Sequence, residues 1–160
     1  MATVSIRPLS AEDGETAAHI FFDAVHQGAA EFYSIEQRIA WAGSAPNPSG
    51  WQIRLCGVSG FAADIDGEMV GFMTLDSDGY IDLAFVRTDA SGKGIGQRLY
   101  KMIEAQAIQN KTPKLTTHAS KKAKPFFERM GWCVDQEQVV TRKGVSLTNF
   151  KMFKLLDPNS

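Results

Sequence analysis

The chain has 160 residues, of which 44% are hydrophobic and 22% are charged, and its net charge is −1 at pH 7. This length suits one domain over residues 1–160 with a sizeable core, and the composition is ordinary for a soluble globular protein. A net charge so close to zero provides no global field for binding nucleic acid or an anionic membrane, so any anion site must be local.

The N-terminal segment and the cysteines indicate neither secretion nor a metal site. Residues 1–10 (MATVSIRPLS) lack the apolar core of a signal peptide, and no apolar run approaches the roughly 18 residues of a membrane span. Cys56 and Cys133 lie far apart in the sequence, without the spacing of metal ligands. We therefore expect a cytoplasmic protein with no metal and with two buried free thiols.

The first third of the chain predicts a strand followed by helices. Residues 4–9 (VSIRPL) predict the strand. Helices over residues 10–29 and 34–41 are predicted because each segment begins with a capping-box pattern, Ser-x-x-Asp and Ser-x-x-Gln. Residues 42–50 (AGSAPNPSG) predict a loop, since two prolines and two glycines interrupt regular structure, and a weak helical turn follows at residues 52–55.

The middle of the chain predicts three strands with antiparallel neighbours. Residues 61–65 (FAADI) and 68–75 (EMVGFMTL) flank Asp66-Gly67, a dipeptide favoured in the tight turns of hairpins. Residues 76–79 (DSDG) predict a second turn. It leads into a third strand at residues 80–86 (YIDLAFV).

The second half predicts a strand that runs parallel to residues 80–86. A helix comes first, because apolar residues recur at helical spacing, namely Ile95, Leu99, Met102, Ile103 and Ala107. The strand at 114–119 (KLTTHA) then completes a crossover connection, which implies parallel pairing. A short helix at 123–130 and a hairpin over 132–155 follow. Together the elements predict an α+β fold with a mixed, mostly antiparallel central sheet and helices on both faces.

Three glycines precede the long helix at every second position. Gly92, Gly94 and Gly96 form G-x-G-x-G, which is neither the dinucleotide pattern G-x-G-x-x-G nor a P-loop. Bare backbone N–H groups at the start of a helix can bind phosphate oxygens, and Lys93 and Arg98 could add positive charge. The alternative is a flexible connection between strand and helix.

This segment resembles a motif of a known family. Residues 91–99 (SGKGIGQRL), after an apolar strand, resemble motif A of the GNAT N-acetyltransferase superfamily. The order of elements is also that of this superfamily, and residues 125–132 (PFFERMGW) resemble its penultimate segment. Residues 22–43 are similar to a bacterial branch of mostly uncharacterised small acetyltransferases, with Tyr33, Gln37 and Trp41 at characteristic places.

The resemblance implies acetyl-coenzyme A as co-substrate. Its pyrophosphate would lie on the backbone amides of residues 92–97, and its pantetheine between strands 80–86 and 114–119, which splay apart. Ser91 stands where the motif usually has Arg or Gln, which weakens the charge of the loop but not its amides. The implied cofactor-binding residues are Phe85, Val86, Ser91, Gly92, Lys93, Gly94, Ile95, Gly96, Gln97, Ser120 and Phe127.

Two residues are candidates for the base that removes a proton from the amine. Asp82 lies in an otherwise apolar strand, where a carboxylate is costly to bury without a task or a partner. His118 lies near the end of strand 114–119 and titrates near neutral pH. For each residue the alternative is a structural role in hydrogen bonding.

The acid that protonates the departing thiolate is less evident. Many relatives have a tyrosine at the position that Phe127 occupies, so this role cannot be carried over to the chain. Tyr80, Tyr33 or water could protonate the thiolate, or it could leave unassisted. Phe127 is then a wall of the pantetheine site or part of the core.

The acceptor site is expected in the N-terminal helices and the loop at 42–50. The candidate residues, which offer π faces and a carboxylate to an amine, are His26, Glu31, Tyr33 and Trp41. The basic run at 121–124 is either a solvated surface or a contact to the adenosine end of the cofactor.

The resemblance thus implies an N-acetyltransferase that acetylates a primary amine of a small molecule or peptide. A non-catalytic module that binds or senses acyl-coenzyme A is the alternative, because the tyrosine and the motif arginine are missing. Relatives often form homodimers, and the sequence leaves the oligomeric state open. Neither nucleic acid nor a membrane is an expected partner.

Overall fold

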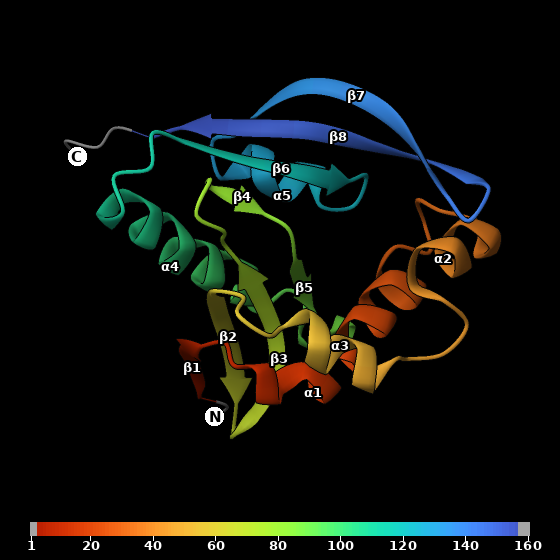
Figure 1. The fold of residues 1–160 in the computed structure, drawn as a ribbon, viewed down its shortest axis with the longest axis horizontal. Helices are drawn as coiled ribbons and strands as arrows, with labels where there is room; N and C mark the ends of the chain where they lie inside the picture. Colours follow the sequence, from red (N-terminus) through yellow and green to blue (C-terminus); the bar gives the residue numbers. More distant parts are fainter. Residues whose placement is uncertain (1–2, 157–160) are drawn as a thin grey trace.

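The structure is a computed structural model that describes residues 3–156, and its strands form two four-stranded sheets. The strands are β1 (Val4–Pro8), β2 (Gly60–Ile65), β3 (Glu68–Thr74), β4 (Tyr80–Ile81), β5 (Ala84–Val86), β6 (Lys114–Ser120), β7 (Cys133–Arg142) and β8 (Val145–Leu155). The first sheet has the order β1-β2-β3-β5 and the second the order β4-β6-β8-β7. The second sheet lies above the first in Figure 1. All pairs are antiparallel except β4 with β6, so the expected α+β fold is confirmed.

The described residues form five α-helices, α1 (Gly14–Asp23), α2 (Ile35–Ala42), α3 (Pro48–Arg54), α4 (Ile95–Gln109) and α5 (Lys124–Arg129). Of these, α1, α3 and α4 cover the two faces of the first sheet. Ala62 and Phe72 of the sheet pack in the core cluster that holds α1 and α3. Ala63 and Met73 pack in the cluster that holds α4 and reaches the second sheet. Helix α4 therefore joins the two sheets, whereas α1 and α3 close the opposite face (Figure 1).

Both capping boxes are confirmed. The backbone N–H of Ser10 donates to the carboxylate of Asp13, and the hydroxyl of Ser10 accepts from the N–H of Glu12. At the start of α2, the N–H of Ser34 donates to the side chain of Gln37, and the N–H of Gln37 donates to the hydroxyl of Ser34. The first helix continues past α1 as a π-helical segment, Ala24–Gly28.

The predicted loop at 42–50 is shorter than expected, because α3 begins within it. The side chain of Asn47 accepts a hydrogen bond from the N–H of Gly50. Pro48 occupies the first helical turn, where its missing N–H has no helical partner to lose. A proline that seemed to break regular structure here begins a helix.

The two hairpin turns are confirmed, and the turn residues have the backbone geometry that the dipeptides predict. Asp66 and Gly67 have φ angles of 51° and 84°, and Lys143 and Gly144 have φ angles of 50° and 78°. Positive φ at both central residues is the conformation that suits a two-residue hairpin.

The single strand expected at residues 80–86 is two short strands that belong to different sheets. Tyr80 and Ile81 pair in parallel with β6, whereas Ala84 to Val86 pair with β3. Between them, Leu83 donates its N–H to the buried hydroxyl of Thr74, and its carbonyl accepts from the N–H of Thr74. These two bonds draw the chain from the second sheet into the first.

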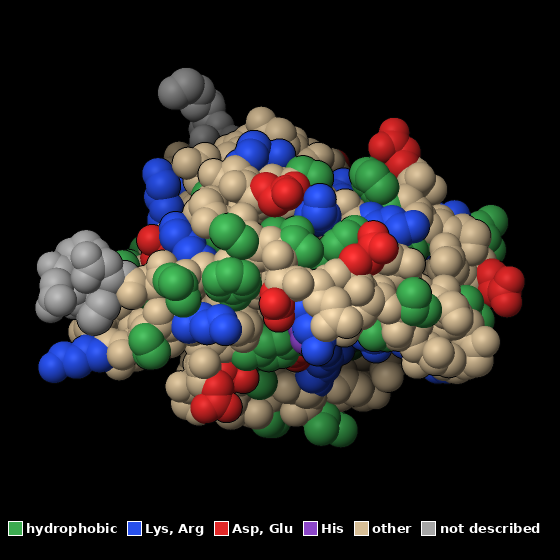
Figure 2. Space-filling view, turned by 90° about the horizontal axis from the view of Figure 1, so that it is seen from above, with side chains coloured by type: hydrophobic (Ala, Val, Ile, Leu, Met, Phe, Trp, Pro, Cys, Tyr) green, Lys and Arg blue, Asp and Glu red, His purple; other side chains and the backbone are tan. Residues whose placement is uncertain are grey.

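The buried stripe of α4 and the burial of the cysteines differ from expectation. Met102 is 40% exposed, and Tyr100 is buried in the stripe instead. Both cysteines are free as predicted, but both are exposed. Cys56 follows the last turn of α3, and Cys133 begins β7, which has a partner on one side only. The surface over the second sheet has interspersed acidic and basic side chains, in keeping with the small net charge (Figure 2).

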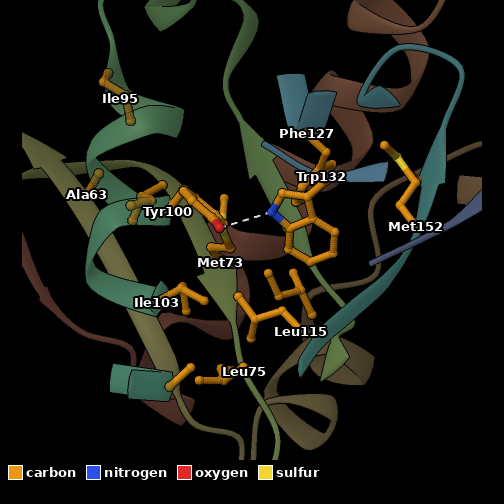
Figure 3. Packing of buried hydrophobic residues seen from close by; sticks show 14 of the residues in the cluster. Ala63, Met73, Leu75, Ile95, Tyr100, Ile103, Leu115, Phe127, Trp132 and Met152 are labelled. Carbon is orange, nitrogen blue, oxygen red and sulfur yellow. Dashed lines mark hydrogen bonds between the residues drawn. The ribbon is translucent and has the colours of Figure 1, made fainter. Parts of the chain in front are cut away.

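A buried polar network connects α4 with the second sheet. The indole N–H of Trp132 donates to the hydroxyl of Tyr100 at 3.0 Å, as Figure 3 shows among the surrounding apolar side chains. The hydroxyl of Tyr100 donates to Glu104, which also accepts from the ammonium of Lys154 at 3.0 Å. Burial and the bond to Glu104 raise the pKa of Tyr100, so the hydroxyl remains protonated. The network satisfies a buried indole that apolar packing alone would leave unbonded.

We predict that Tyr100→Phe destabilises the fold by about 1–3 kcal/mol, because the buried N–H of Trp132 loses its acceptor. Urea unfolding followed by tryptophan fluorescence measures this change. Lys101→Ala on the exposed side of the same helix is the control, and it should alter the free energy of unfolding by less than about 0.5 kcal/mol. Equal stability of both variants would show that the bond to Trp132 contributes nothing.

Candidate active site

The glycines between β5 and α4 expose the backbone. Gly92 and Gly94 have φ angles of 78° and 74°, and a Cβ at either position would meet no atom within 4 Å. Their N–H groups therefore lie in a left-handed turn with open space beside it, at the N-terminus of α4. Gly96 has a different role: a Cβ there would lie 3.3 Å from Cε1 of Phe126, so its small size permits α5 to approach.

The segment before these glycines is fixed by charged side chains. The carboxylate of Asp23, at the end of α1, accepts bonds from the N–H and the hydroxyl of Thr88. Arg87 forms ion pairs with Glu68 at 2.8 Å and with Asp89 at 2.6 Å. Asp23 therefore holds Thr88 in place just before the glycine turn, a role that no sequence pattern indicated.

A cavity of about 390 Å³ lies beside the glycine turn. It is lined by nearly all of the residues expected to bind the cofactor: Phe85, Val86, Ser91, Gly92, Gly94, Ile95, Gly96, Gln97, Ser120 and Phe127. Lys93 is exposed and does not line it. Arg98 donates to the carbonyl of Val4 at 3.1 Å, so it is directed to β1 and does not line the cavity.

Two basic side chains that the glycine motif does not contain line this cavity. They are Lys122 and Arg129, and neither has a carboxylate within 4.0 Å among residues 3–156. Lys122 belongs to the basic run at 121–124, whose alternative interpretation as a phosphate contact this position favours. The remaining lining is mainly apolar and includes Met73, Phe126 and Met130. The cavity thus has an apolar interior and a basic rim.

A second cavity, of about 170 Å³, lies on the other side of the point where β5 and β6 diverge. The residues that border both cavities are Trp41, Ala84, Phe85, Ser120, Ala123 and Phe127. Phe127 is only 1% exposed, so its ring is part of a closed wall. A molecule in the larger cavity and one in the smaller cavity would therefore meet at this shared wall.

The three predicted catalytic residues line the smaller cavity together. Tyr80 and Ile81 pair with Thr116 and Thr117, so the next residues in register are Asp82 and His118. Residues opposite each other in a sheet point to the same face, and both side chains are exposed. The rings of Tyr80 and His118 meet edge to face, with centroids 5.5 Å apart.

Asp82 is not the buried strand carboxylate that its apolar neighbours suggested. Its side chain is 53% exposed, and its Oδ2 lies 3.4 Å from Nη2 of Arg54. The ladder to β6 ends one residue earlier, which leaves Asp82 free to face solvent and Arg54. The cost of burying a charge is thereby avoided.

Two titratable side chains near Asp82, those of His118 and Tyr80, are both uncharged at neutral pH, but only the tyrosine then has a proton to give. Partial desolvation of the His118 ring and the positive charge of Lys151 lower the pKa of His118, against a smaller opposing effect of Asp82. Burial raises the pKa of Tyr80, and the negative charges of Asp82 and Asp76 add to this. His118 is therefore a neutral acceptor of protons, and Tyr80 is a protonated hydroxyl.

Of the residues expected to bind the acceptor, two line the smaller cavity and two do not. Tyr33 and Trp41 line it, and the hydroxyl of Tyr33 donates to the carbonyl of Thr148 at 2.6 Å. His26 and Glu31 line neither cavity. His26 is used structurally, since its Nε2 lies 2.8 Å from the carbonyl oxygen of Gly43, and Glu31 is exposed in a turn.

The loop at 42–50 also lines neither cavity. Its place is taken by residues that sequence reasoning missed, from the end of α3 and from the hairpin of β7 and β8. These are Arg54, Arg142, Leu147 and Asn149. No local pattern marks them, because the long hairpin reaches the site through tertiary packing.

Two classes of site have no counterpart in the part of the chain that the structure describes. Over residues 3–156, no helix combines the length and the hydropathy needed to cross a membrane. Within the same range, no group of three or more His, Cys, Asp or Glu side chains could hold a metal ion.

Comparison with known proteins shows what the chain is related to. A family model described as "Acetyltransferase (GNAT) domain" matches residues 23–154. The N-acetyltransferase YafP of Escherichia coli, described as uncharacterised, is 33% identical over 153 residues, which are 95% of this chain and 96% of that protein.

Solved structures agree with this relationship. A GCN5-related N-acetyltransferase from Rhodopseudomonas palustris superposes with a TM-score of 0.89 at 34% identity, over 98% of both chains. The PaiA N-acetyltransferase from Thermoplasma acidophilum, solved in complex with coenzyme A, shares the fold with a TM-score of 0.75 at 19% identity, over 96% of this chain and 99% of that one. On the family match and the relationship to YafP, the chain belongs to the GNAT acetyltransferase family.

Proposed function

We propose that this acetyltransferase transfers the acetyl group of acetyl-coenzyme A to a primary amine by direct attack of the amine on the thioester. The observation that carries the proposal is the shared wall between the two cavities, where β5 and β6 diverge. One cavity can hold the donor and the other the acceptor. The Thermoplasma protein of the same fold was solved with coenzyme A, which supports coenzyme A as the ligand.

The residues of the larger cavity fit coenzyme A. The open turn at Gly92 and Gly94 offers backbone N–H groups to a diphosphate, and Lys122 and Arg129 add positive charge at the rim. The apolar interior suits the pantetheine arm. When bound there, acetyl-coenzyme A supplies a thioester whose carbonyl carbon accepts a nucleophile.

The reaction has a simple balance of bonds and protons. The amine nitrogen forms the new bond to the acetyl carbon, and the bond from that carbon to sulfur breaks. An ammonium acceptor gives up two protons in total. One of these protons is released to solvent, and the sulfur gains the equivalent of the other when it leaves as a thiol.

We assign the removal of the amine proton to His118 and Asp82. His118 is neutral at physiological pH because burial and Lys151 lower its pKa, so it can accept a proton without first losing one. Asp82 lies beside it and would stabilise the imidazolium that forms. Both side chains line the cavity proposed for the acceptor.

We assign protonation of the thiolate to Tyr80. Its hydroxyl has no hydrogen-bond partner in residues 3–156, and because its pKa is raised it is protonated at neutral pH, so its proton is available. Tyr33 is the poorer candidate, because its hydroxyl already donates to Thr148 and accepts from the N–H of Lys121.

One observation favours a second function, a module that binds acyl-coenzyme A without turnover. The shared wall carries Phe127, which has no hydroxyl to give a proton. If the module only binds, a broad set of amines will cause no release of thiol although coenzyme A binds. Turnover with any amine excludes this alternative.

We predict that Gly94→Glu weakens binding of acetyl-coenzyme A at least about tenfold, because it places a side chain and a negative charge in the phosphate turn. Titration calorimetry measures the affinity. Gly144→Glu is the matched control, since Gly144 also has a positive φ and open space around it but lies in the turn between β7 and β8. Equal affinities of the two variants would refute the assignment of the turn.

We predict that His118→Ala and Asp82→Asn each lower kcat while leaving the affinity for coenzyme A unchanged. Loss of a general base costs about 10²–10⁴-fold in rate, and the effect should be greatest for His118. His19→Ala, an exposed histidine on α1, is the matched control. If neither variant is slower than the control, both residues are structural.

The pH profile provides a separate test of His118. The lowered pKa places its titration below the ordinary value of 6.5, and only the neutral ring accepts a proton. We therefore expect kcat/KM to rise with pH through an acidic limb below pH 6.5 and to lose that limb in His118→Ala. A limb that persists unchanged in the variant would assign it to another group.

A further inference from the structure

The smaller cavity has more positive than negative charge. Arg54 comes from the end of α3 and Arg142 from the end of β7, and both line the cavity. Arg142 and Arg54 both lower the pKa of Tyr80, against burial and Asp82, so the charged groups lie around the same hydroxyl. Lys151 adds a further positive charge near His118.

One of the two arginines of the smaller cavity has an acidic partner within residues 3–156, and the other has none. Asp82 is the only carboxylate among the lining residues that the structure describes, and Arg54 lies 3.4 Å from it. Arg54 also stacks on the ring of Trp51, 4.8 Å from its centroid. Arg142 has neither an ion pair nor a side-chain hydrogen bond within residues 3–156, although it borders the same cavity.

This balance disfavours an acceptor that carries only amines. Such a molecule is a cation before it reacts, and it would meet two guanidinium groups with one carboxylate to offset them. A carboxylate on the acceptor reverses the sign of that interaction. The planar guanidinium binds a carboxylate through paired hydrogen bonds, which also fixes its direction.

We propose that the acceptor is a small amine that also carries a carboxylate, an amino acid in the chemical sense, with the carboxylate bound by Arg142. The inference rests on the proposed function, because it takes the smaller cavity to be the acceptor site. The carboxylate lies at the rim, and the amine is thereby directed toward Asp82 and His118. Arg54, held by Asp82 and Trp51, keeps that end of the cavity positive.

The size and surface of the cavity agree with such a ligand. Its volume of about 170 Å³ is below the roughly 300–1,000 Å³ of sites for drug-sized molecules, which favours a small acceptor. Its lining holds two arginines and one carboxylate, so an anionic group would meet a net positive surface there.

The test compares amines that differ only in the carboxylate. Each common L-amino acid is assayed beside its α-carboxamide, with acetyl-coenzyme A and detection of released thiol. The amine of the amide is the less basic and so is more often unprotonated, which means that intrinsic reactivity favours the amide. A preference of about tenfold or more in kcat/KM for the best amino acid over its amide must therefore come from the protein, and it is the expected result.

Arg142→Gln identifies the group responsible. We expect this variant to lose about tenfold in kcat/KM for the amino acid and to lose most of the preference over the amide. Lys143→Gln is the matched control, because it removes the same charge from the neighbouring, exposed residue, which does not line the cavity. The inference is overturned if the amide is the equal or better acceptor, or if both variants reduce the preference alike.

A separate binding measurement distinguishes this inference from the proposed function. N-acetyl-L-amino acids are titrated calorimetrically into the protein with coenzyme A present, which requires no turnover. Binding that Arg142→Gln weakens about tenfold supports the carboxylate site even if no amine is acetylated and the proposed function fails. Turnover of amines that lack a carboxylate, with no binding of any N-acetyl-amino acid, overturns the inference and leaves the proposed function intact.

Discussion

The exchange of hydrogen bonds between Leu83 and Thr74 is the constraint on which the site depends. Thr74 is buried, and its hydroxyl and its N–H both bind the backbone of Leu83. These bonds end the pairing of β4 with β6 and begin the pairing of β5 with β3. A hydroxyl buried at this point would be costly to leave unbonded, so the change of sheet is fixed rather than incidental. Without it, β5 would continue beside β6, and the two strands would not diverge between the cavities.

The divergence of β5 and β6 also separates the two cavities, which differ in their lining and share a single layer of side chains. On one side the apolar interior and the bare amides of Gly92 and Gly94 suit a long flexible ligand with a charged end. On the other side the lining is polar and charged, with Asp82 and His118 lying directly after the last parallel pair, Ile81 and Thr117. Phe127 closes the layer between them. In the proposed function, donor and acceptor therefore occupy two differently lined cavities that share one wall.

The sequence predicted features that local interactions determine. The capping pairs that begin with Ser10 and Ser34 and the turn at Asp66-Gly67 are decided within four residues, and all were confirmed. The break at Leu83 was missed because its cause is Thr74, on a neighbouring strand. Proline at residue 48 was misread, since its effect depends on whether it begins a helix or interrupts one.

In the candidate site too, the part formed by one contiguous segment was predicted better than the part formed by distant segments. The glycine turn is a contiguous motif, and its residues line one cavity as the resemblance implied, except Lys93. The smaller cavity, which we propose for the acceptor, is assembled from distant segments, so the residues there were only partly predicted. His26 is of a residue type that often binds ligands, but its ring is hydrogen-bonded to the carbonyl of Gly43. Arg142, which no sequence pattern indicated, lines the smaller cavity.

The protonation pattern of the acceptor side follows from how Asp82 is held. Ion pairing with Arg54 keeps the carboxylate at the surface, within reach of both Tyr80 and His118. Its negative charge acts in the same direction on both pKa values, upward, but burial acts in opposite directions, because it disfavours the imidazolium of one group and the phenolate of the other. The two pKa values are thus driven apart across neutral pH, which agrees with the roles of base and acid that we propose for His118 and Tyr80. In the proposed reaction Tyr80 gives its proton from the smaller cavity, so no hydroxyl on the shared wall is required.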